Sequence, residues 1–213
     1  RGYATMLESS GEQNDQQKNY ARMITRGVDN MAKLVNNLFD LGRIDFGVGL
    51  QVESIPVLDN IELVTSSLQL QATQKKISLG VEIPKDLPDT VEAYQALLQQ
   101  ALYILVENAL KYTPEGGTVT IHLQCAANSL TFAIQDSGIG IPKIDLPRLF
   151  EKFYRGTNRE ALSQRGTGLG LAIVKSIAER HGGKVWAESE LGQGSTFFLQ
   201  IPLVQPKESR QSQ

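Results

Sequence analysis

The chain has little of several features that would assign it to a class at once. It has one cysteine, Cys125, in 213 residues, which excludes an internal disulfide. No apolar run approaches the roughly 20 residues that span a bilayer, and no signal peptide is visible, so we expect a cytoplasmic chain, with membrane anchoring of a full-length protein left open. A net charge of −2 and a pI of about 5.8 give no basic excess. We therefore expect neither nucleic acid nor a membrane among its partners.

Two glycine-rich motifs are the most informative features that are present. Residues 136–142 read Asp-Ser-Gly-Ile-Gly-Ile-Pro and follow a strand with alternating apolar residues at 130–134. Residues 166–171 read Gly-Thr-Gly-Leu-Gly-Leu and lead into a predicted helix at 169–181. A carboxylate at a strand end can accept a hydrogen bond from an exocyclic amine, and glycine lets backbone approach a flat ring or a polyphosphate. The two motifs together predict a nucleotide site anchored by Asp136.

A third motif closes an apolar helix upstream. Residues 108–114 read Asn-Ala-Leu-Lys-Tyr-Thr-Pro. Asn108 and Lys111 lie three residues apart, so they share one face of a helix and can address one ligand. An amide oxygen, a cation and an aromatic ring are suited to holding magnesium and a phosphate chain. The alternative is an ordinary helix C-terminus with a polar last turn.

The N-terminal part predicts one long helix at 15–46, because its apolar residues recur in steps of three and four. These residues are Tyr20, Ile24, Val28, Met31, Val35, Leu38, Leu41 and Ile44. Such a stripe is typical of a coiled-coil seam and needs a partner helix, for which residues 1–9 offer only a short one. We expect dimerisation. The alternative is a single amphipathic helix that lies on the globular part.

The rest of the chain alternates strands and helices. Strands are predicted at 50–55, 77–83, 118–125, 129–136, 183–189 and 195–202, and helices at 57–75, 91–112 and 169–181. Helices against a mostly antiparallel sheet indicate an α+β fold, a two-layer α/β sandwich. The predicted units are a helical part at 1–48, a globular domain at 49–204 and a frayed tail at 205–213. Cys125 falls on the apolar side of its strand and is expected in the core.

In their order along the chain, the motifs resemble the N, G1, F and G2 boxes of the ATP-binding domain of sensor histidine kinases, in the superfamily that includes gyrase and MutL. Residues 150–155, Phe-Glu-Lys-Phe-Tyr-Arg, match the F box, and residues 192–196, Gly-Gln-Gly-Ser-Thr, match the last glycine segment. The resemblance covers nearly the whole chain. It implies a Bergerat-type ATP-binding fold, preceded by a long helix from a helical-hairpin dimerisation bundle.

The resemblance also implies roles for individual residues, with ATP and Mg²⁺ as ligands. Asn108 would bind the metal, Lys111 the phosphates and Asp136 the adenine, and Arg155 would lie in a lid over ATP. The implied ATP-binding set is Asn108, Lys111, Tyr112, Asp136, Gly138, Gly140, Ile141, Arg155, Gly166, Thr167, Gly168, Leu169, Gly170 and Thr196. A solvated loop arginine and a strand threonine without a ligand role remain the alternatives for Arg155 and Thr196.

The histidines depart from the family pattern, which requires a phosphoacceptor histidine followed by an acidic residue. His122 is expected to be exposed on the polar face of a strand, and His181 to lie at a helix end favoured by the macrodipole. Neither fits, so the acceptor is expected upstream of residue 1. No residue of the chain is assigned as catalytic, and the chain is not expected to autophosphorylate alone.

Two further departures lie in the ATP-binding part. Ile104 stands four residues before Asn108, where the family usually has asparagine and the superfamily a catalytic glutamate. An alkyl side chain cannot act as a base, and Glu107 is expected on a different helix face, so efficient ATP hydrolysis is not expected. Tyr94 stands where the family often has aspartate. Nucleotide binding should survive both changes better than turnover does.

The expected function is that of the catalytic region of a sensor histidine kinase. It would transfer the γ-phosphoryl group of Mg-ATP to a histidine, and the phosphoryl group would then pass to a response regulator. The expected assembly is a homodimer formed through the N-terminal hairpin. One alternative is a degenerate kinase that binds nucleotide and regulates a partner without transfer. Another is an ATPase or serine kinase of the same superfamily, which Ile104 disfavours.

Overall fold

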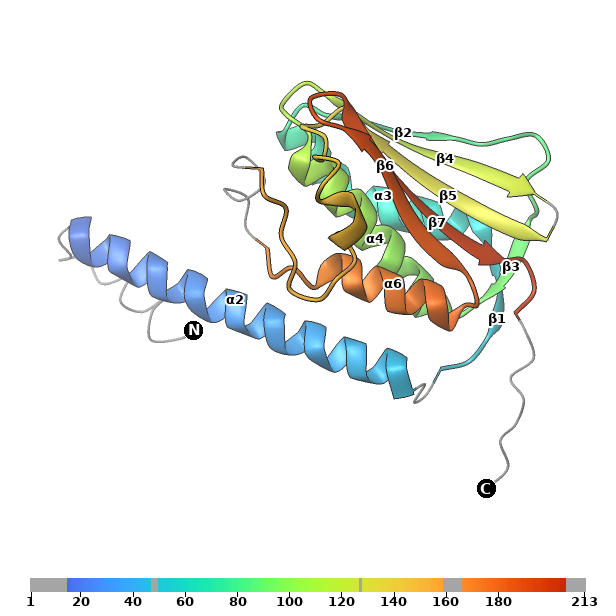
Figure 1. Ribbon diagram of the computed structural model, residues 1–213, viewed down its shortest axis with the longest axis horizontal. Coiled ribbons are helices and arrows are strands. Elements are labelled where there is room, and N and C mark those ends of the chain that lie inside the picture. The colour runs from blue at the N-terminus through green and yellow to red at the C-terminus, as the bar shows by residue number, and fades with distance from the viewer. Residues whose placement is uncertain (1–14, 47–49, 127, 159–165, 206–213) are drawn as a thin grey trace.

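The computed structural model describes residues 15–46, 50–126, 128–158 and 166–205 (Figure 1). The predictions for residues 1–9, for the helix break at 47–49 and for most of the tail lie outside these ranges. In chain order, the elements are α2 (Asp15–Phe46), β1 (Glu53–Pro56), α3 (Val57–Gln74), β2 (Ser78–Glu82), β3 (Thr90–Ala93), α4 (Gln95–Tyr112), β4 (Thr118–Ala126), β5 (Ser129–Asp136), the 3-10 turn η1 (Leu146–Arg148), α6 (Gly170–Arg180), β6 (Lys184–Glu190) and β7 (Gly194–Pro202).

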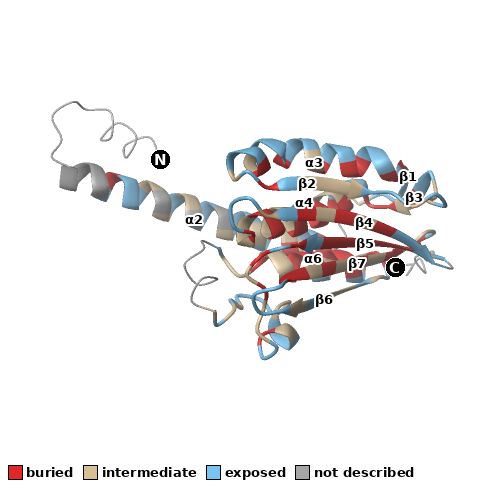
Figure 2. Cartoon of the chain, turned by 90° about the horizontal axis from the view of Figure 1, so that it is seen from above, coloured by how far each residue is buried: buried red, intermediate tan, exposed pale blue. Residues whose placement is uncertain are grey.

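Within the described part of the chain, the main sheet has five strands in the order β2-β4-β5-β7-β6. β2 pairs with β4 in parallel, and the remaining pairs are antiparallel. Helices α3, α4 and α6 cover one face of this sheet, and the other face is open (Figures 1 and 2). The predicted two-layer α+β sandwich is confirmed.

Period-two patterns decide which side chains of the strands enter the core. On β5, Leu130, Phe132 and Ile134 are buried beneath the helices. The helices bury positions three or four apart, as Leu98, Leu102 and Leu105 do on α4. The core therefore lies between the sheet and the helical layer, and the loops at one end of the strands are left to form a site.

The predicted helix at 91–112 begins too early. Residues 90–93 form β3, which pairs antiparallel with β1, with Ile55 opposite Val91. Val91 and Ala93 are buried while Glu92 between them is less so, which is a strand pattern. Pairing with β1 satisfies the backbone of this segment, so α4 begins only at Gln95.

Helix α2 has two different environments along its apolar stripe. Leu41 and Ile44, near its C-terminal end, are buried, and this helix contacts α6. The stripe residues Tyr20, Ile24, Val28, Met31, Val35 and Leu38 are exposed. In Figure 1 most of α2 extends beyond the sandwich. The alternative of a helix lying on the globular part therefore holds only for the last turns. None of the described helices combines the length and apolarity that crossing a membrane requires.

The prediction that Cys125 lies in the core is wrong, because Cys125 is exposed. The alternation of buried residues on β4 stops after Leu123, and the last three residues of the strand are all exposed. This end of the β4–β5 hairpin extends past the helical layer (Figure 2), so the face that is buried elsewhere has no cover here.

His181 lies at the end of α6, as predicted, but it is buried and neutral rather than a charged partner of the helix dipole. Its exposed fraction is 0%. Nδ1 lies 2.8 Å from the carbonyl oxygen of Ile177, and Nε2 lies 3.1 Å from the backbone nitrogen of Tyr94. A carbonyl can only accept and an amide N–H can only donate, so Nδ1 carries the proton and Nε2 is bare. Burial lowers the pKa of His181 below its usual value.

We expect His181 to make the fold less stable in mild acid. The folded chain takes up this proton at a lower pH than the unfolded chain, whose histidine titrates near 6.5. The unfolded state therefore binds more protons as pH falls through that value, and the free energy of unfolding decreases. Between about pH 7.5 and about pH 6 the loss is at most about 1 kcal/mol. Urea unfolding at both pH values should show a smaller loss in His181→Gln, and equal losses would contradict this assignment.

Candidate functional site

A cavity of about 610 Å³ opens among the C-terminal half of α4, the end of β5, the loop after it and the start of α6. It brings together the predicted residues Asn108, Lys111, Tyr112, Asp136, Gly140, Ile141, Arg155, Gly166, Thr167, Gly168 and Gly170. This volume is within the usual range for small-molecule sites. Residues 159–165 of the predicted lid lie outside the described part of the chain.

Asp136 is a buried charged group of this cavity, with an exposed fraction of 6%. Its Oδ1 accepts a hydrogen bond of 2.8 Å from the backbone N–H of Gly138. Burial raises the pKa of Asp136 to about 6, although the backbone N–H groups of Gly138 and Ser195 act in the opposite direction. The carboxylate is thus held by two backbone donors and keeps acceptor capacity for a ligand.

Backbone from two loops meets beside Asp136. Gly140 has φ of +66°, and a Cβ on it would collide with the carbonyl of Glu190. The N–H of Ile141 donates to Oγ of Ser189 at 2.8 Å, and the N–H of Gly192 donates to the carbonyl of Ile139 at 2.8 Å. The loop after β5 is therefore fixed against the β6–β7 turn, and only glycine fits at position 140.

The end of α4 supplies polar groups to the same cavity. Asn108, Lys111 and Tyr112 all border it. The Lys111 ammonium lies 4.8 Å from the centre of the Tyr112 ring. A Cβ on Gly166 would lie 3.1 Å from Nζ of Lys111. The end of α4 and the second glycine motif are thus in contact, although more than fifty residues separate them in the chain.

Ile104 and Glu107 also border the cavity. A Cβ on Gly170 would lie 3.2 Å from Cγ2 of Ile104, so the alkyl group packs against the start of α6. Glu107 was expected on a different helix face from Asn108, and it nevertheless borders the same cavity. The cavity is wide enough around α4 to include two adjacent positions of the helix. The pKa of Tyr103 is raised mainly by burial, and the negative charge of Glu107 raises it further.

Asp145 holds together the described first part of the predicted lid, and this role was not predicted. It is buried, and it accepts hydrogen bonds of 2.8 Å from the Tyr154 hydroxyl and 2.8 Å from the backbone N–H of Thr157. Burial opposes ionisation, but these donors and the charge of Arg148 together hold the pKa of Asp145 below its usual value. Arg155 lies between the two residues that Asp145 holds, and it borders the cavity.

The start of α6 is joined to α2. Oγ1 of Thr167 accepts from the N–H of Leu169 at 3.3 Å and from Nδ2 of Asn37 at 3.2 Å. Nε2 of Gln100, on α4, donates to Asp40 of α2 at 2.8 Å. Asn37 also borders the cavity. The last turns of the long helix therefore form part of the wall of the site.

Three predicted residues do not border the cavity. Gly138 is buried behind it, where its N–H binds Asp136, and Leu169 is buried in the core. Thr196 pairs with Gln135 and therefore lies on the open face of the sheet. Ser195 and Phe197, on either side of Thr196, border the cavity instead. The sequence alone could have shown that Ser195 and Phe197 face inward. Phe197, Leu199 and Ile201 are the alternating apolar residues of β7, and Ser195 lies on the same side of the strand.

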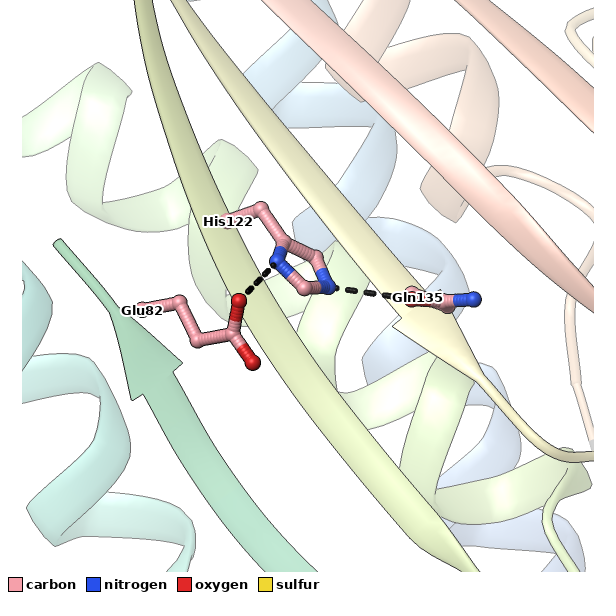
Figure 3. Close-up of polar contacts among 3 residues, drawn as sticks. All are labelled: Glu82, His122 and Gln135. Atoms are coloured by element: carbon pink, nitrogen blue, oxygen red, sulfur yellow. Dashed lines mark hydrogen bonds and ion pairs between the residues drawn. The ribbon is translucent and has the colours of Figure 1, made fainter. Parts of the chain in front are cut away.

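The two histidines lie away from the cavity. His122 is half-buried on the open face of the sheet, rather than merely exposed as predicted. Its Nδ1 lies 3.0 Å from Oε2 of Glu82, and its Nε2 lies 3.0 Å from Oε1 of Gln135 (Figure 3). These contacts join β2, β4 and β5. His181 is enclosed in the core, with both ring nitrogens bonded.

Comparison with known families decides the relationship. The model of the histidine kinase-, DNA gyrase B- and HSP90-like ATPases matches residues 93–205. The model of the His Kinase A (phospho-acceptor) domain matches residues 1–47, although the histidines of this chain are at 122 and 181. The chain belongs to the sensor histidine kinase family of two-component systems.

Individual relatives agree with this. The chain is 33% identical to the sensor histidine kinase WalK of Bacillus subtilis, across 98% of this chain and 34% of the relative. It is 39% identical to the adaptive-response sensory kinase SasA of Synechococcus elongatus, across 67% of this chain and 36% of the relative. The chain thus spans about a third of the length of these relatives.

Solved structures show the same architecture. Full-length ShkA in complex with AMPPNP superposes with a TM-score of 0.75 and 27% identity, over 96% of this chain and 42% of that one. The nucleotide-free catalytic domain of the histidine kinase ThkA gives a TM-score of 0.64 and 28% identity, over 73% of this chain and 97% of that one.

Gly140 provides a test of the loop packing. We expect Gly140→Ala to lower the free energy of unfolding by at least about 2 kcal/mol more than Gly116→Ala does. Both glycines have positive φ, but a Cβ on Gly116 meets nothing within 4 Å, so the control isolates backbone strain of about 1–2 kcal/mol. Urea unfolding measures both variants. Equal losses would show that the loops can separate without cost.

Proposed function

We propose that the cavity binds Mg-ATP and that this region transfers the γ-phosphoryl group to a histidine, from which it passes to a response regulator. The observation that carries the proposal is that a buried carboxylate, Asp136, borders the same cavity as Lys111, Asn108 and the glycine-rich start of α6. One cavity thus offers an acceptor for a base, a cation for phosphates and an amide oxygen for a metal.

The base would bind beside Asp136. An ionised carboxylate accepts a hydrogen bond from the exocyclic amine of adenine, and this charge-assisted bond is stronger than a neutral one. Ile141 and Phe197 border the cavity and offer apolar surface to the ring. Because Ser195 and Gly138 hold the carboxylate from behind, Asp136 does not need to reorganise when the base arrives.

The phosphates would lie among Lys111, Arg155 and residues 166–170. The backbone amides at a helix N-terminus and its dipole favour anions, and α6 begins at Gly170 on the cavity. Arg155 is exposed and borders the cavity, so its guanidinium can reach phosphate oxygens. Positioning and charge neutralisation of this kind are the main protein contributions to phosphoryl transfer.

The residues present fit a magnesium ion that is held mainly by nucleotide. Mg²⁺ commonly takes one or two protein ligands and fills its shell with phosphate oxygens and water. Asn108 offers one amide oxygen at the cavity. Over the described ranges, no group of three or more His, Cys, Asp or Glu side chains could hold a metal. The ion would supply positive charge to the phosphates, and Asn108 would orient it.

The acceptor histidine would come from outside the 213 residues. His181 is inaccessible, and His122 is engaged on the open face of the sheet. The match of residues 1–47 to the phospho-acceptor domain supports an acceptor presented by a helical hairpin that includes α2. The exposed stripe on α2 supports homodimerisation through that hairpin, since an apolar face of this length needs a partner helix.

The degenerate-kinase alternative rests on Ile104, which cannot supply the polar group that the family usually has there. The comparisons do not favour it, because the similar proteins are named as sensor histidine kinases. The ShkA structure, with its AMPPNP, supports nucleotide binding by this fold. Transfer therefore stands as the proposed activity, and Ile104 as a residue that limits its rate.

Asp136 gives the first test of nucleotide binding. Titration calorimetry with a non-hydrolysable ATP analogue and Mg²⁺ should show that Asp136→Asn loses at least about tenfold in affinity, because a charge-assisted hydrogen bond is lost. Affinity of the unaltered chain should also fall as pH drops below about 6, where Asp136 takes up its proton. Thr196→Ala, on the opposite face of the sheet, is the matched control and should bind normally. Failure of the unaltered chain to bind would refute the proposal.

Transfer is tested by adding a histidine-containing dimerisation hairpin in trans with labelled ATP. We expect an acid-labile phosphohistidine on the hairpin, and much less of it with Asp136→Asn when ATP is limiting. ATP binding without any transfer would favour the degenerate kinase. In that case Ile104→Asn should be compared with the unaltered chain, because gain of transfer without a change in affinity would assign the defect to that side chain.

A further inference from the structure

The carbonyl groups at the C-terminal end of α4 are bonded to partners from three segments. The last four carbonyls of a helix have no partner inside the helix. Here Ala109 O accepts from Thr113, through its N–H at 3.0 Å and its hydroxyl at 2.7 Å. Tyr112 O accepts from the N–H of Ile139 at 3.2 Å. The latter bond joins the helix to the loop that follows Asp136.

The remaining carbonyls at this helix end are bonded to one side chain. Nζ of Lys75 donates to Leu110 O at 2.6 Å, to Lys111 O at 3.1 Å and to Thr113 O at 2.7 Å. An ammonium group has three N–H donors, so these bonds use all of them. Lys75 is the C-cap residue of α3, 35 to 38 residues earlier in the chain. It is partly buried, and burial lowers its pKa.

We propose that Lys75 is a positioning residue of the nucleotide site, which rests on the proposed function above. It holds the last turn of α4, and this turn carries Lys111 and Tyr112 at the cavity. Lys75 itself is not among the residues that border the cavity. Its positive charge lies at the negative end of the helix dipole, where a cation is stabilising. It therefore acts on the ligand through the backbone of α4.

Loss of the ammonium group would remove the hydrogen-bond donor of the Leu110, Lys111 and Thr113 carbonyls. These carbonyls lie at the end of α4 that must stay fixed beside the cavity. The last turn would then open more often, and Lys111 would leave the phosphate-binding geometry. Through the bond between Tyr112 and Ile139, the loop after Asp136 would loosen as well. Because hydrogen bonds from a charged group are worth more than neutral ones, we expect nucleotide affinity to fall about tenfold.

The next residue in the chain provides a matched control. Lys76 has a side chain that is 76% exposed and forms a surface ion pair with Glu115. Lys75→Met and Lys76→Met therefore make the same chemical change one residue apart, and exposed ion pairs contribute little to stability. Lys75→Arg tests rescue, since a guanidinium can also donate to several carbonyls. All variants are made in the 213-residue chain and compared at a temperature at which thermal melts show them folded.

Calorimetry with the Mg-ATP analogue should show about a tenfold loss for Lys75→Met, partial recovery for Lys75→Arg and a change within about twofold for Lys76→Met. Hydrogen exchange without nucleotide should be faster in Lys75→Met at the amides of Thr113 and Ile139, and unchanged in the central strands. A general structural defect would instead increase exchange throughout the domain.

Two results would overturn the inference. The first is equal affinity of Lys75→Met and the unaltered chain. The second is unchanged exchange at Thr113 and Ile139. If the unaltered chain binds no nucleotide, the proposed function fails. The exchange comparison between Lys75→Met and Lys76→Met then decides alone whether Lys75 holds the end of α4.

Discussion

The antiparallel pairing of β5 with β7 is the constraint on which the site depends. It places Asp136 opposite Ser195, so the carboxylate lies at a strand end where the Ser195 amide can bind it. Gly194 has φ of +91° and lets the start of β7 pass directly against the backbone of Asp136. If β5 slipped by one residue against β7, Gln135 would face inward in place of Asp136, and the cavity would lose its carboxylate.

Burial in this position means that ionised Asp136 lowers the free energy of unfolding. Its pKa is raised from 3.8 to about 6, so the unfolded chain releases this proton at a lower pH than the folded chain. The favourable contribution present in acid is lost as pH rises through about 6. At neutral pH the folded chain therefore holds a desolvated charge. A carboxylate that only terminated a strand would gain nothing from such burial, and this is why perturbed groups in cavities point to ligand sites.

The sequence was sufficient to predict burial and site residues where a local periodicity or a local motif determines them. The alternation on β5 predicted the burial of its apolar residues, and the glycine motifs predicted most of the residues that meet in the cavity. It was not sufficient where a distant partner decides. The four residues of β3 became a strand because β1 pairs with them, and Cys125 is exposed because the helices end before the hairpin does. The bonds of Asp145 and Lys75 depend on how segments far apart in the chain meet.

The attachment of α2 has a geometric consequence. With 32 residues at about 1.5 Å each, this helix is about 48 Å long. It is fixed near one end, where Asn37 binds Thr167 and Asp40 binds Gln100. A tilt of about 5° about that point displaces the far end by several ångströms, while the atoms at the cavity wall move by only a fraction of one. A small displacement at the cavity wall therefore accompanies a much larger displacement of the far end of α2. The shape of the cavity and the direction of the helix are thus mechanically linked.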